Sequence, residues 1–456
     1  MRIERIETAG LGDATYLLTH DGLGVIIDPQ RDIARFERAA AGADVEVRAV
    51  VETHVHNDYV SGARHLAAAT GAELVLPAAA GAAYRHRAAF HQEDLDLGSG
   101  LALRPLHTPG HTPEHTSYLV VVDGEPLAVF TGGSLLTGSA GRTDLVAEAQ
   151  ARQLARLQYQ SLERLAALPG HVGVYPTHGE GSFCTATGAG RDVSDIATEL
   201  TENEALGHDD ADAFAAWQAA SLQPFPDYYA RMGPANLLGR TPMPRTQLPL
   251  LEPADVDALD GVAEVVDIRP RAQATAGHVP GSQLIELGDD FGVWAGWVLD
   301  LDAPVVLVAT PDDDVAEAAL QLARIGIDDV RGVLPVAAWS QAGRQLRRLD
   351  SAAPHEVAAA GDGQVAAAAG GQAGPVILDV RSPGEVAEGG LESALHRYVP
   401  DLRGDAGRWL PIGDRPYVLC SSGRRAAIAA GLLARRGHDP VPLLDGGIEE
   451  VLAARD

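Results

Sequence analysis

The first part of the chain, from Arg2 to about Ser182, alternates short apolar runs with turns and helical stretches. Runs of aliphatic residues bounded by Gly, Pro or Asp predict β-strands. They are residues 24–28, 47–53, 73–77, 101–107, 118–122, 128–131 and 173–176. Residues 32–41 and 149–168 have the apolar spacing of helices. This pattern predicts an α/β domain with polar residues gathered in loops after the strands.

The pattern changes after this domain. Residues 185–249 are first helical and polar and then rich in proline, which is typical of a domain boundary. Two similar segments follow, and in each an apolar strand ends in Asp-x-Arg, at 267–269 and at 379–381. The second strands are 305–309 and 417–419, and the helices after them are 315–325 and 425–436. We therefore expect a duplicated α/β domain. The Ala/Gly-rich segment between the copies, 352–374, is expected to be either a flexible linker or a poorly ordered helix.

Charge and composition exclude some classes of partner. The 35 basic residues are outnumbered by 63 acidic ones, which gives a formal net charge of −28. Because such a surface repels phosphate, we expect neither a nucleic-acid nor a membrane partner. The sequence shows no apolar run of signal-peptide length and no run of about 18 apolar residues. We therefore expect a cytoplasmic protein.

Histidines and a carboxylate follow several of the predicted strands. His54, His56 and Asp58 alternate directly after one strand, and an extended backbone would turn all three to one side. His111 in Thr-Pro-Gly-His and His178 in Pro-Thr-His-Gly follow two further strands. Imidazole and carboxylate are metal ligands, so these five residues predict a metal site.

These motifs resemble those of the metallo-β-lactamase superfamily, whose fold is an αββα sandwich with a metal at one edge of its sheets. More narrowly, Thr131-Gly132-Gly133-Ser134 followed by Gly141-Arg142-Thr143-Asp144 is similar to the persulfide dioxygenase branch. Members of that branch hold one Fe(2+) ion by two histidines and an aspartate and oxidise glutathione persulfide to sulfite. The resemblance implies that His54 and His111 are iron ligands and that Arg142 contacts the substrate.

Two positions depart from these families. Tyr59 stands where related hydrolases such as glyoxalase II have a histidine that binds a second metal, so we expect at most one ion. Gly133 stands where the persulfide dioxygenases have their aspartate ligand, so the site lacks its anionic ligand. Either iron stays bound with His56, His178, water or a substrate thiolate in the gap, or the domain has lost its metal.

The chain has two cysteines, Cys184 and Cys420, which are too few for a disulfide framework. Cys420 lies between a predicted strand and a predicted helix, where amide N–H groups and the helix end favour the thiolate. Arg424 and Arg425 add positive charge for a bound anion. From the residues alone, this loop suits either a phosphocysteine or a persulfide.

Flanking motifs are similar to those of a rhodanese domain, whose active loop is Cys-x-x-Gly-x-Arg. The loop runs from Cys420 to Arg425, the six-residue form that suits sulfur. The resemblance implies that Cys420 is the nucleophile, with the amides of Ser421, Ser422, Gly423, Arg424 and Arg425 around its sulfur. In the first copy the same loop, residues 309–314, has no cysteine and three aspartates, so thiol chemistry is excluded there.

The fold class predicted is α/β: a metallo-β-lactamase sandwich over residues 1–245, an inactive rhodanese-like domain over 251–350 and a rhodanese domain over 360–456. We expect an enzyme of sulfide detoxification, which oxidises a low-molecular-weight persulfide at iron and transfers sulfane sulfur through Cys420. Its partners would be a persulfide with sulfite or thiosulfate, and relatives imply a dimer or tetramer. Cys184 is a candidate auxiliary thiol, by resemblance to fused enzymes of this kind.

Two alternatives remain open. A pseudo-oxygenase, with a metal site degraded by Gly133, would act mainly as a sulfurtransferase at Cys420. A thioester hydrolase of the glyoxalase II type would need two metals, and Tyr59 and Gly133 each remove a ligand that such a site uses.

Overall fold

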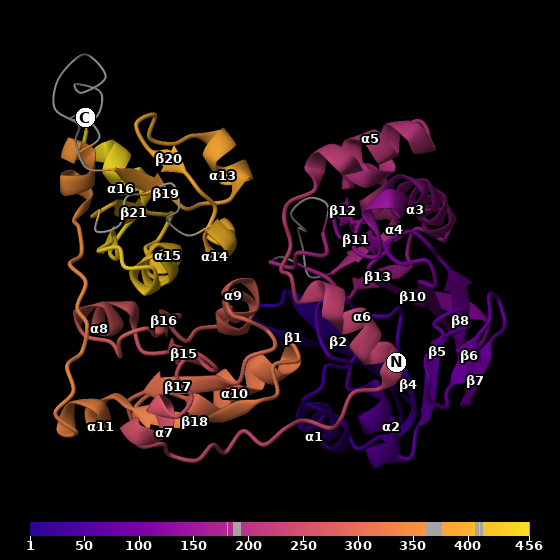
Figure 1. Cartoon of the computed structure of the whole chain (residues 1–456). Coiled ribbons are helices and arrows are strands. Elements are labelled where there is room, and N and C mark those ends of the chain that lie inside the picture. Colours follow the sequence, from indigo (N-terminus) through magenta and orange to yellow (C-terminus); the bar gives the residue numbers. More distant parts are fainter. Residues whose placement is uncertain (180, 186–192, 361–375, 406–409, 411–413, 456) are drawn as a thin grey trace. The chain divides into compact units, whose positions relative to one another are not determined.

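The computed structural model describes residues 1–179, 181–185, 193–360, 376–405, 410 and 414–455. Contacts divide them into two compact units (Figure 1). The first consists of Met1–Pro244 with Ala323–Gly326, and the second of Arg245–Leu322 with Ile327–Asp456. The three-domain division at 1–245, 251–350 and 360–456 stays a prediction.

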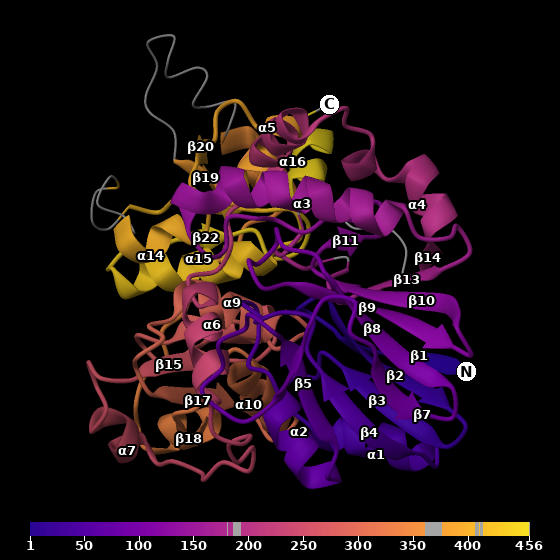
Figure 2. The same ribbon diagram turned by 90° about the vertical axis from the view of Figure 1, so that its right-hand side faces the viewer.

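The first unit contains two six-stranded sheets (Figure 2). One has the order β1-β2-β3-β4-β5-β6 and the other the order β14-β13-β10-β9-β8-β7. The strands of the first sheet are β1 (Arg2–Thr8), β2 (Asp13–His20), β3 (Leu23–Ile27), β4 (Glu46–Val51), β5 (Glu73–Pro77) and β6 (Arg87–Ala89). Those of the second are β7 (Leu95–Gly98), β8 (Leu101–His107), β9 (Thr116–Val122), β10 (Glu125–Gly132), β13 (Gly173–Pro176) and β14 (Ser194–Asp195). The short strands β11 (Leu135–Leu136) and β12 (Ser139–Ala140) pair with each other.

Three apolar layers hold these sheets and their helices together. Side chains from both sheets, among them Tyr16 and Phe130, meet in the middle. Helices α1 (Ala34–Gly42) and α2 (Ala63–Thr70) pack on the outer face of the first sheet through Phe36 and Leu66. Helices α3 (Ala151–Ala166), α4 (Ile196–Glu202) and α5 (Ala211–Ser221) pack on the second sheet. This arrangement confirms the predicted αββα sandwich.

The remaining helical elements of this unit are η1 (Glu148–Gln150), η2 (Glu204–Leu206) and α6 (Tyr229–Leu238). Helices α4 and α5 fall in the part of the segment predicted to be helical and polar, whereas α6 falls in the part that was singled out as rich in proline. Among the residues placed here, no helix has the length and apolar character needed to cross a membrane.

The second unit contains two four-stranded parallel sheets with corresponding strand orders, β16-β15-β17-β18 and β20-β19-β21-β22. The strands of the first are β15 (Glu264–Asp267), β16 (Gln283–Leu284), β17 (Val305–Ala309) and β18 (Val330–Pro335). Those of the second are β19 (Ile377–Asp379), β20 (Leu395–His396), β21 (Tyr417–Leu419) and β22 (Val441–Pro442). The shared order is what a duplication predicts. We call the first the Cys-less repeat and the second the Cys420 repeat.

The Asp-x-Arg motifs have the same structural role in both repeats. Arg269 binds the carboxylate of Asp267 at the end of β15, with Nη2 to Oδ2 at 2.6 Å, and Arg381 binds Asp379 after β19 at 2.8 Å. Each arginine also donates to a glycine carbonyl eight residues further on, Gly277 or Gly389. The motif therefore ties a strand end to the loop that follows its helix.

The helices of the Cys-less repeat are α7 (Pro253–Asp257), α8 (Arg271–Ala276), α9 (Phe291–Val298), α10 (Val315–Arg324) and α11 (Val336–Gln341). Those of the Cys420 repeat are α13 (Pro383–Glu388), α14 (Asp401–Asp405), α15 (Arg424–Arg435) and α16 (Ile448–Ala453). Residues 354–360 of the segment predicted to be a flexible linker or a poorly ordered helix are helical. Its remainder from residue 361 lies outside the described residues.

Candidate metal centre and cysteine loop

The histidine-rich segment after β4 is a loop rather than a continued strand. Strand β4 ends at Val51, and residues 53–58 carry no strand assignment. The prediction that strand alternation turns His54, His56 and Asp58 to one side was therefore wrong in its premise. Each side chain instead points where its own hydrogen bonds direct it.

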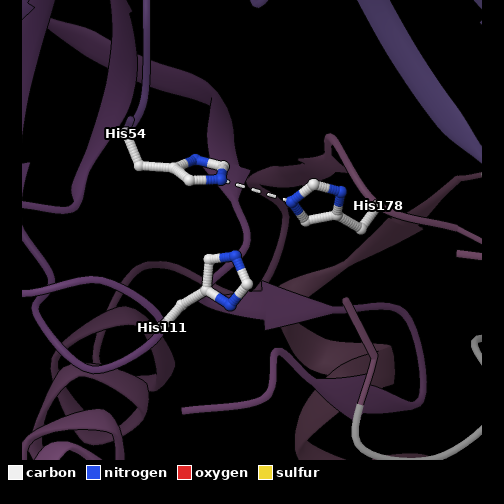
Figure 3. Close-up of side chains that lie close together, drawn as sticks. All are labelled: His54, His111 and His178. Atoms are coloured by element: carbon white, nitrogen blue, oxygen red, sulfur yellow. Dashed lines mark hydrogen bonds between the residues drawn. The ribbon is translucent and has the colours of Figure 1, made fainter. Parts of the chain in front are cut away.

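Three histidines from distant parts of the chain meet at this edge of the sandwich. His54 follows β4, His111 follows β8, and His178 follows β13. One ring nitrogen from each lies within 4.8 Å of the others, and the three rings face a common space (Figure 3). All three are buried. The structure thus brings His54, His111 and His178 together, and it also places ligand atoms of His56, Asp58 and His178 within 4.8 Å of one another.

Each of these rings is held through Nδ1, which leaves Nε2 for the common space. His178 Nδ1 donates to Asp13 Oδ1 at 2.8 Å, and His111 Nδ1 donates to the Arg142 carbonyl oxygen at 2.8 Å. His54 Nδ1 lies 2.8 Å from Thr53 Oγ1, whose proton goes to an Asp28 oxygen at 2.7 Å, so Nδ1 is the donor here too. Fixing a ligand histidine through its other nitrogen is the usual arrangement around protein-bound metals.

The Nε2 atoms fit a bound cation better than they fit one another. His54 Nε2 and His178 Nε2 lie 3.3 Å apart, and His111 Nε2 is buried without a hydrogen-bond partner among the described residues. Two nitrogens bound to one ion at about 2.0–2.1 Å and a tetrahedral angle would lie roughly 3.3 Å apart. Three imidazoles suit Fe, Zn, Cu or Ni rather than Mg or Ca. The donor set therefore fits a transition metal.

Burial and neighbouring charge set the protonation of the three rings. Burial lowers the pKa of His54 well below its ordinary value and that of His111 to about 3, and nearby imidazoles add to the effect. Burial also opposes a charge on His178, but the carboxylates of Asp58 and Asp13 outweigh it and raise its pKa to about 9. His54 and His111 are therefore neutral at pH 7, whereas a metal at His178 Nε2 would have to displace a proton.

His56 lies beside His54, with ring centroids 4.1 Å apart, but its Nε2 is engaged elsewhere. That atom lies 2.7 Å from Glu52 Oε2, 3.0 Å from the Tyr59 hydroxyl and 3.3 Å from Asp28 Oδ1. Although burial opposes it, the two carboxylates raise the pKa of His56 well above its ordinary value. His56 is thus held as a cation.

Asp58 faces the outer side of His178, with Oδ2 3.2 Å from Nδ1. The same oxygen accepts a hydrogen bond from Cys184 Sγ at 3.4 Å. Burial and the Asp58 carboxylate raise the pKa of the Cys184 thiol well above its ordinary value. Cys184, the candidate auxiliary thiol, is therefore a protonated donor, and Asp58 lies between it and His178 of the centre.

Gly133 lies against the ring of His111. A β-carbon built on Gly133 would lie 2.2 Å from His111 Cδ2 and 2.5 Å from its Nε2. No side chain fits there while His111 keeps its position. The missing aspartate is therefore more than a lost ligand, because its space is taken by the histidine itself.

Arg142, the candidate substrate contact, is buried. Its guanidinium binds both oxygens of Asp144 at 2.7 Å and donates to the Phe183 carbonyl oxygen. Its own carbonyl oxygen orients His111. The structure thus assigns its backbone a place beside the centre, and substrate contact through its side chain stays a prediction.

Cys420 lies between β21 and α15, as predicted, and is fully buried. The amides of Ser422 and Gly423 donate to Cys420 Sγ at 3.5 and 3.1 Å. Gly423 has φ = +86°, and a β-carbon on it would lie 2.0 Å from the Leu444 carbonyl oxygen, so glycine is required there. The loop is a cradle of amides that suits a negatively charged sulfur.

Both arginines of the loop are paired with carboxylates. Arg425 Nη2 binds Glu385 Oε1 at 2.7 Å and Ser421 Oγ at 2.6 Å. Arg424 Nη2 binds Asp290 Oδ1 at 2.7 Å. Their roles in catalysis and substrate binding stay predictions, and in this conformation the groups that face the sulfur are the amides of Ser422 and Gly423.

In the corresponding loop of the Cys-less repeat, the side chain of Asp313 binds another residue of the same loop, Thr310. Asp313 Oδ2 accepts from the Thr310 amide at 2.7 Å and from the Thr310 hydroxyl at 2.8 Å. By strand register Thr310 corresponds to Ser421, and Pro311, at the position of Ser422, has no N–H to offer a sulfur.

Sequence reasoning missed the residues that orient the histidines. Asp13, Asp28 and Thr53 make the key hydrogen bonds, and Glu52 holds His56. Of these residues, only Asp28 has a local signal in the sequence, an Asp-Pro pair at the end of an apolar strand. In the structure its backbone has φ = +54°.

Comparison with known proteins agrees with this architecture. Residues 10–178 match the metallo-β-lactamase superfamily, and residues 363–454 match the rhodanese-like domain. A metallo-β-lactamase from Staphylococcus aureus has a solved structure that is 27% identical, with a TM-score of 0.65, over 74% of this chain and 98% of that one.

Curated relatives match the first unit. A hydroxyacylglutathione hydrolase of Methylobacillus flagellatus is 30% identical over 36% of this chain, and the match spans 60% of that relative's length. A protein named as a metallo-hydrolase in Burkholderia pseudomallei is 32% identical over 40% of this chain and 69% of its own length. With the three-histidine centre and the sandwich that carries it, these matches show that the chain belongs to the metallo-β-lactamase superfamily and carries a C-terminal rhodanese-like domain.

Proposed function

We propose that this chain is an enzyme of sulfur metabolism that oxidises a low-molecular-weight thiol persulfide and passes sulfane sulfur through Cys420. The first reaction is R–S–SH + O2 + H2O → R–SH + SO3²⁻ + 2 H⁺. The observation that carries the proposal is that one chain holds both a histidine set suited to a redox metal and a thiol cradled by amides.

In this proposal Fe(2+) is held by Nε2 of His54, His111 and His178. Bound non-haem iron supplies the one-electron chemistry that dioxygen requires. Three neutral imidazoles leave the charge of a divalent ion uncompensated, which favours an anionic fourth ligand such as a persulfide. The absence of a carboxylate at Gly133 therefore changes the charge of the centre without removing its ability to bind an anion.

The protein's own groups prepare this site in three ways. Asp13 and the Arg142 carbonyl oxygen accept from Nδ1 of His178 and His111, so that Nε2 of each ring faces the common space. His56 places a buried positive charge beside His54. Cys184 donates to Asp58, and the same Asp58 oxygen faces His178 Nδ1.

The second reaction takes place at Cys420. A persulfide donor transfers its outer sulfur to the thiolate, and sulfite then attacks that sulfur: Cys420–S–S⁻ + SO3²⁻ → Cys420–S⁻ + S2O3²⁻. The S–S bond of the persulfide breaks as the S–S bond of thiosulfate forms, so no external oxidant is needed. The amides of Ser422 and Gly423 stabilise the thiolate that leaves.

A second candidate function is thioester hydrolysis, because the matched relatives include hydroxyacylglutathione hydrolases. That reaction usually uses two metals. His56 is occupied by Glu52 and Tyr59 here, and Tyr59 replaces a ligand of the second metal, so the geometry favours it less. A third candidate, a pseudo-oxygenase, keeps only the chemistry of Cys420 and predicts a centre without metal.

One experiment separates the three candidates. The full chain, purified after growth with iron, is given glutathione persulfide under air in one arm and an S-hydroxyacylglutathione thioester in the other. Persulfide-dependent oxygen uptake with sulfite or thiosulfate as product supports the proposal. Thioester cleavage without oxygen uptake supports the hydrolase, and sulfur transfer without oxygen uptake supports the pseudo-oxygenase.

A further inference from the structure

A side chain of the Cys-less repeat reaches the loop that carries Cys420. Arg271, the first residue of α8, donates from Nε to the Leu444 carbonyl oxygen at 3.0 Å and from Nη2 to the Ser422 carbonyl oxygen at 3.4 Å. Its Nη1 binds Glu286 Oε2 at 2.6 Å. The Glu286 carboxylate thus holds the guanidinium against two carbonyl groups of the neighbouring repeat.

The Ser422 carbonyl belongs to the peptide group whose N–H holds the sulfur. In a planar trans peptide the C=O of one residue and the N–H of the next point in opposite directions. The Gly423 N–H donates to Cys420 Sγ at 3.1 Å, and the oxygen on the other side of that peptide accepts from Arg271. The hydrogen bond from Arg271 to Ser422 O therefore orients this peptide group so that the Gly423 N–H points at the sulfur.

The second carbonyl group that Arg271 binds, that of Leu444, packs against the Cys420 loop at Gly423. A β-carbon on Gly423 would lie 2.0 Å from Leu444 O, so this oxygen rests directly on the Gly423 backbone. Arg271 holds Leu444 O and Ser422 O with one rigid fork. The position of Gly423 is thus fixed on both sides by groups that bind the same guanidinium.

The start of α15 is tied to the same segment of the Cys-less repeat. Arg424, the first residue of α15, donates from Nη2 to the Glu286 carbonyl oxygen at 2.9 Å and pairs with Asp290. Further along, Gln283 Nε2 donates to the Ile428 carbonyl oxygen at 2.7 Å, so α15 packs along β16 (Figure 1). Glu286 therefore binds Arg271 through its carboxylate and Arg424 through its carbonyl oxygen.

We propose that the Cys-less repeat serves as a positioning element for Cys420, with Arg271 as the positioning residue that aims the Gly423 amide at the sulfur. This inference rests on the proposed sulfur transfer at Cys420. It explains why a repeat without a thiol is retained beside an intact one, because its side chain shapes the cradle without touching the substrate.

The test uses the full chain with Cys184→Ala, so that Cys420 is the single thiol. Arg271→Met, Arg271→Lys and the surface control Arg331→Met are compared in two assays. Intact mass follows sulfur loading of Cys420 by inorganic polysulfide, and steady-state kinetics follow transfer from thiosulfate to cyanide. We expect Arg271→Met to lower the loading rate and kcat about tenfold or more, with KM for thiosulfate within about twofold. Arg271→Lys should recover part of the loss, and Arg331→Met should match the parent.

The inference is overturned if Arg271→Met loads and turns over like the parent while only its melting temperature falls, since the contact would then merely join the repeats. A failure of the proposed sulfur transfer has a different signature. The parent would load sulfur from polysulfide but show no turnover above Cys420→Ser, and the loading rates alone would then decide the role of Arg271.

Discussion

Gly133 and His111 occupy the same corner of the centre: a β-carbon on Gly133 would lie 2.2 Å from His111 Cδ2. A protein side chain at position 133 and the present His111 ring are therefore mutually exclusive. The centre depends on a residue with no side chain, so Gly133 is a requirement of the three-histidine arrangement rather than a simple loss.

The first prediction follows from this exclusion. Gly133→Ala should push the His111 ring out of line with His54 and His178 and lower metal affinity about tenfold or more. Competition with a chelator, followed by elemental analysis, measures the effect. Gly42→Ala is the control, because Gly42 also has no positive φ and an added β-carbon there meets nothing within 4 Å. Equal affinity in Gly133→Ala and the unmodified chain would show that His111 is not a ligand.

Replacing Asp13 should lower metal affinity nearly as much as replacing a ligand, although Asp13 itself is not proposed to touch the metal. Asp13→Asn replaces the carboxyl acceptor at His178 Nδ1 with an amide. We expect metal affinity to fall roughly 10–100-fold, because partners of this kind set the orientation and basicity of a ligand histidine. The exposed Asp21→Asn is the matched control. If Asp13→Asn binds metal as tightly as the control, then His178 lies outside the coordination sphere.

Cys184 offers a test of its own. Because its thiol donates to Asp58, which also faces His178, Cys184→Ala should change the product pattern or rate of persulfide oxidation without releasing the metal. A fall of about threefold or more in oxygen uptake with unchanged metal content is expected, and Cys184→Ser, which keeps a donor, should lie between. Unchanged oxygen uptake in Cys184→Ala would assign this cysteine to packing alone.

The Cys420 repeat should lose stability in acid through one ion pair. Burial tends to raise the pKa of Glu385, but its bonds to Arg425 outweigh this and lower the value from 4.5 to about 2. A carboxyl with a lowered folded-state pKa contributes stability above its unfolded value of 4.5, and this contribution disappears as the pH falls toward 2. Since Glu385 is partly exposed, the effect is screened by salt.

Thermal unfolding of the unmodified chain and of Glu385→Gln measures this contribution. The unmodified chain should melt at a higher temperature at pH 6, and the difference should shrink steadily between about pH 4.5 and 2.5. Glu388→Gln, on the same helix and exposed, serves as the reference. A difference that stays constant over this range would mean that the ion pair does not stabilise the fold.

The sequence predicted the fold class and the meeting of three histidines because both depend on local patterns. Apolar runs with turn residues define the strands, and His54, His111 and His178 each follow such a run at the same end of the sandwich. The structure confirms the α/β class, with two sheets in the first unit and two similar parallel sheets in the second.

What the sequence did not reveal depends on contacts between distant residues. Asp13 lies 165 residues from His178, and Arg271 lies 151 residues from Ser422. Neither has a motif, since a single aspartate or arginine on an element end looks like a solvent-exposed residue. His56 was placed among the ligands because its type and spacing fit. Its Nε2 binds Glu52, whereas its Nδ1 is buried without a hydrogen-bond partner among the described residues, so its role as a ligand stays a prediction.

The most direct test of the central claim measures how sulfur products divide between sulfite and thiosulfate. The iron-supplied full chain and its Cys420→Ser variant are given equal glutathione persulfide under air, and oxygen uptake is recorded alongside both anions. We predict equal initial rates of oxygen uptake, with sulfite as the dominant product of the variant and thiosulfate as a major product of the unmodified chain. Because the persulfide that donates sulfane sulfur consumes no oxygen, total uptake by the unmodified chain should fall toward half that of the variant. Equal thiosulfate from both proteins, or no persulfide-dependent oxygen uptake by either, would contradict the central claim.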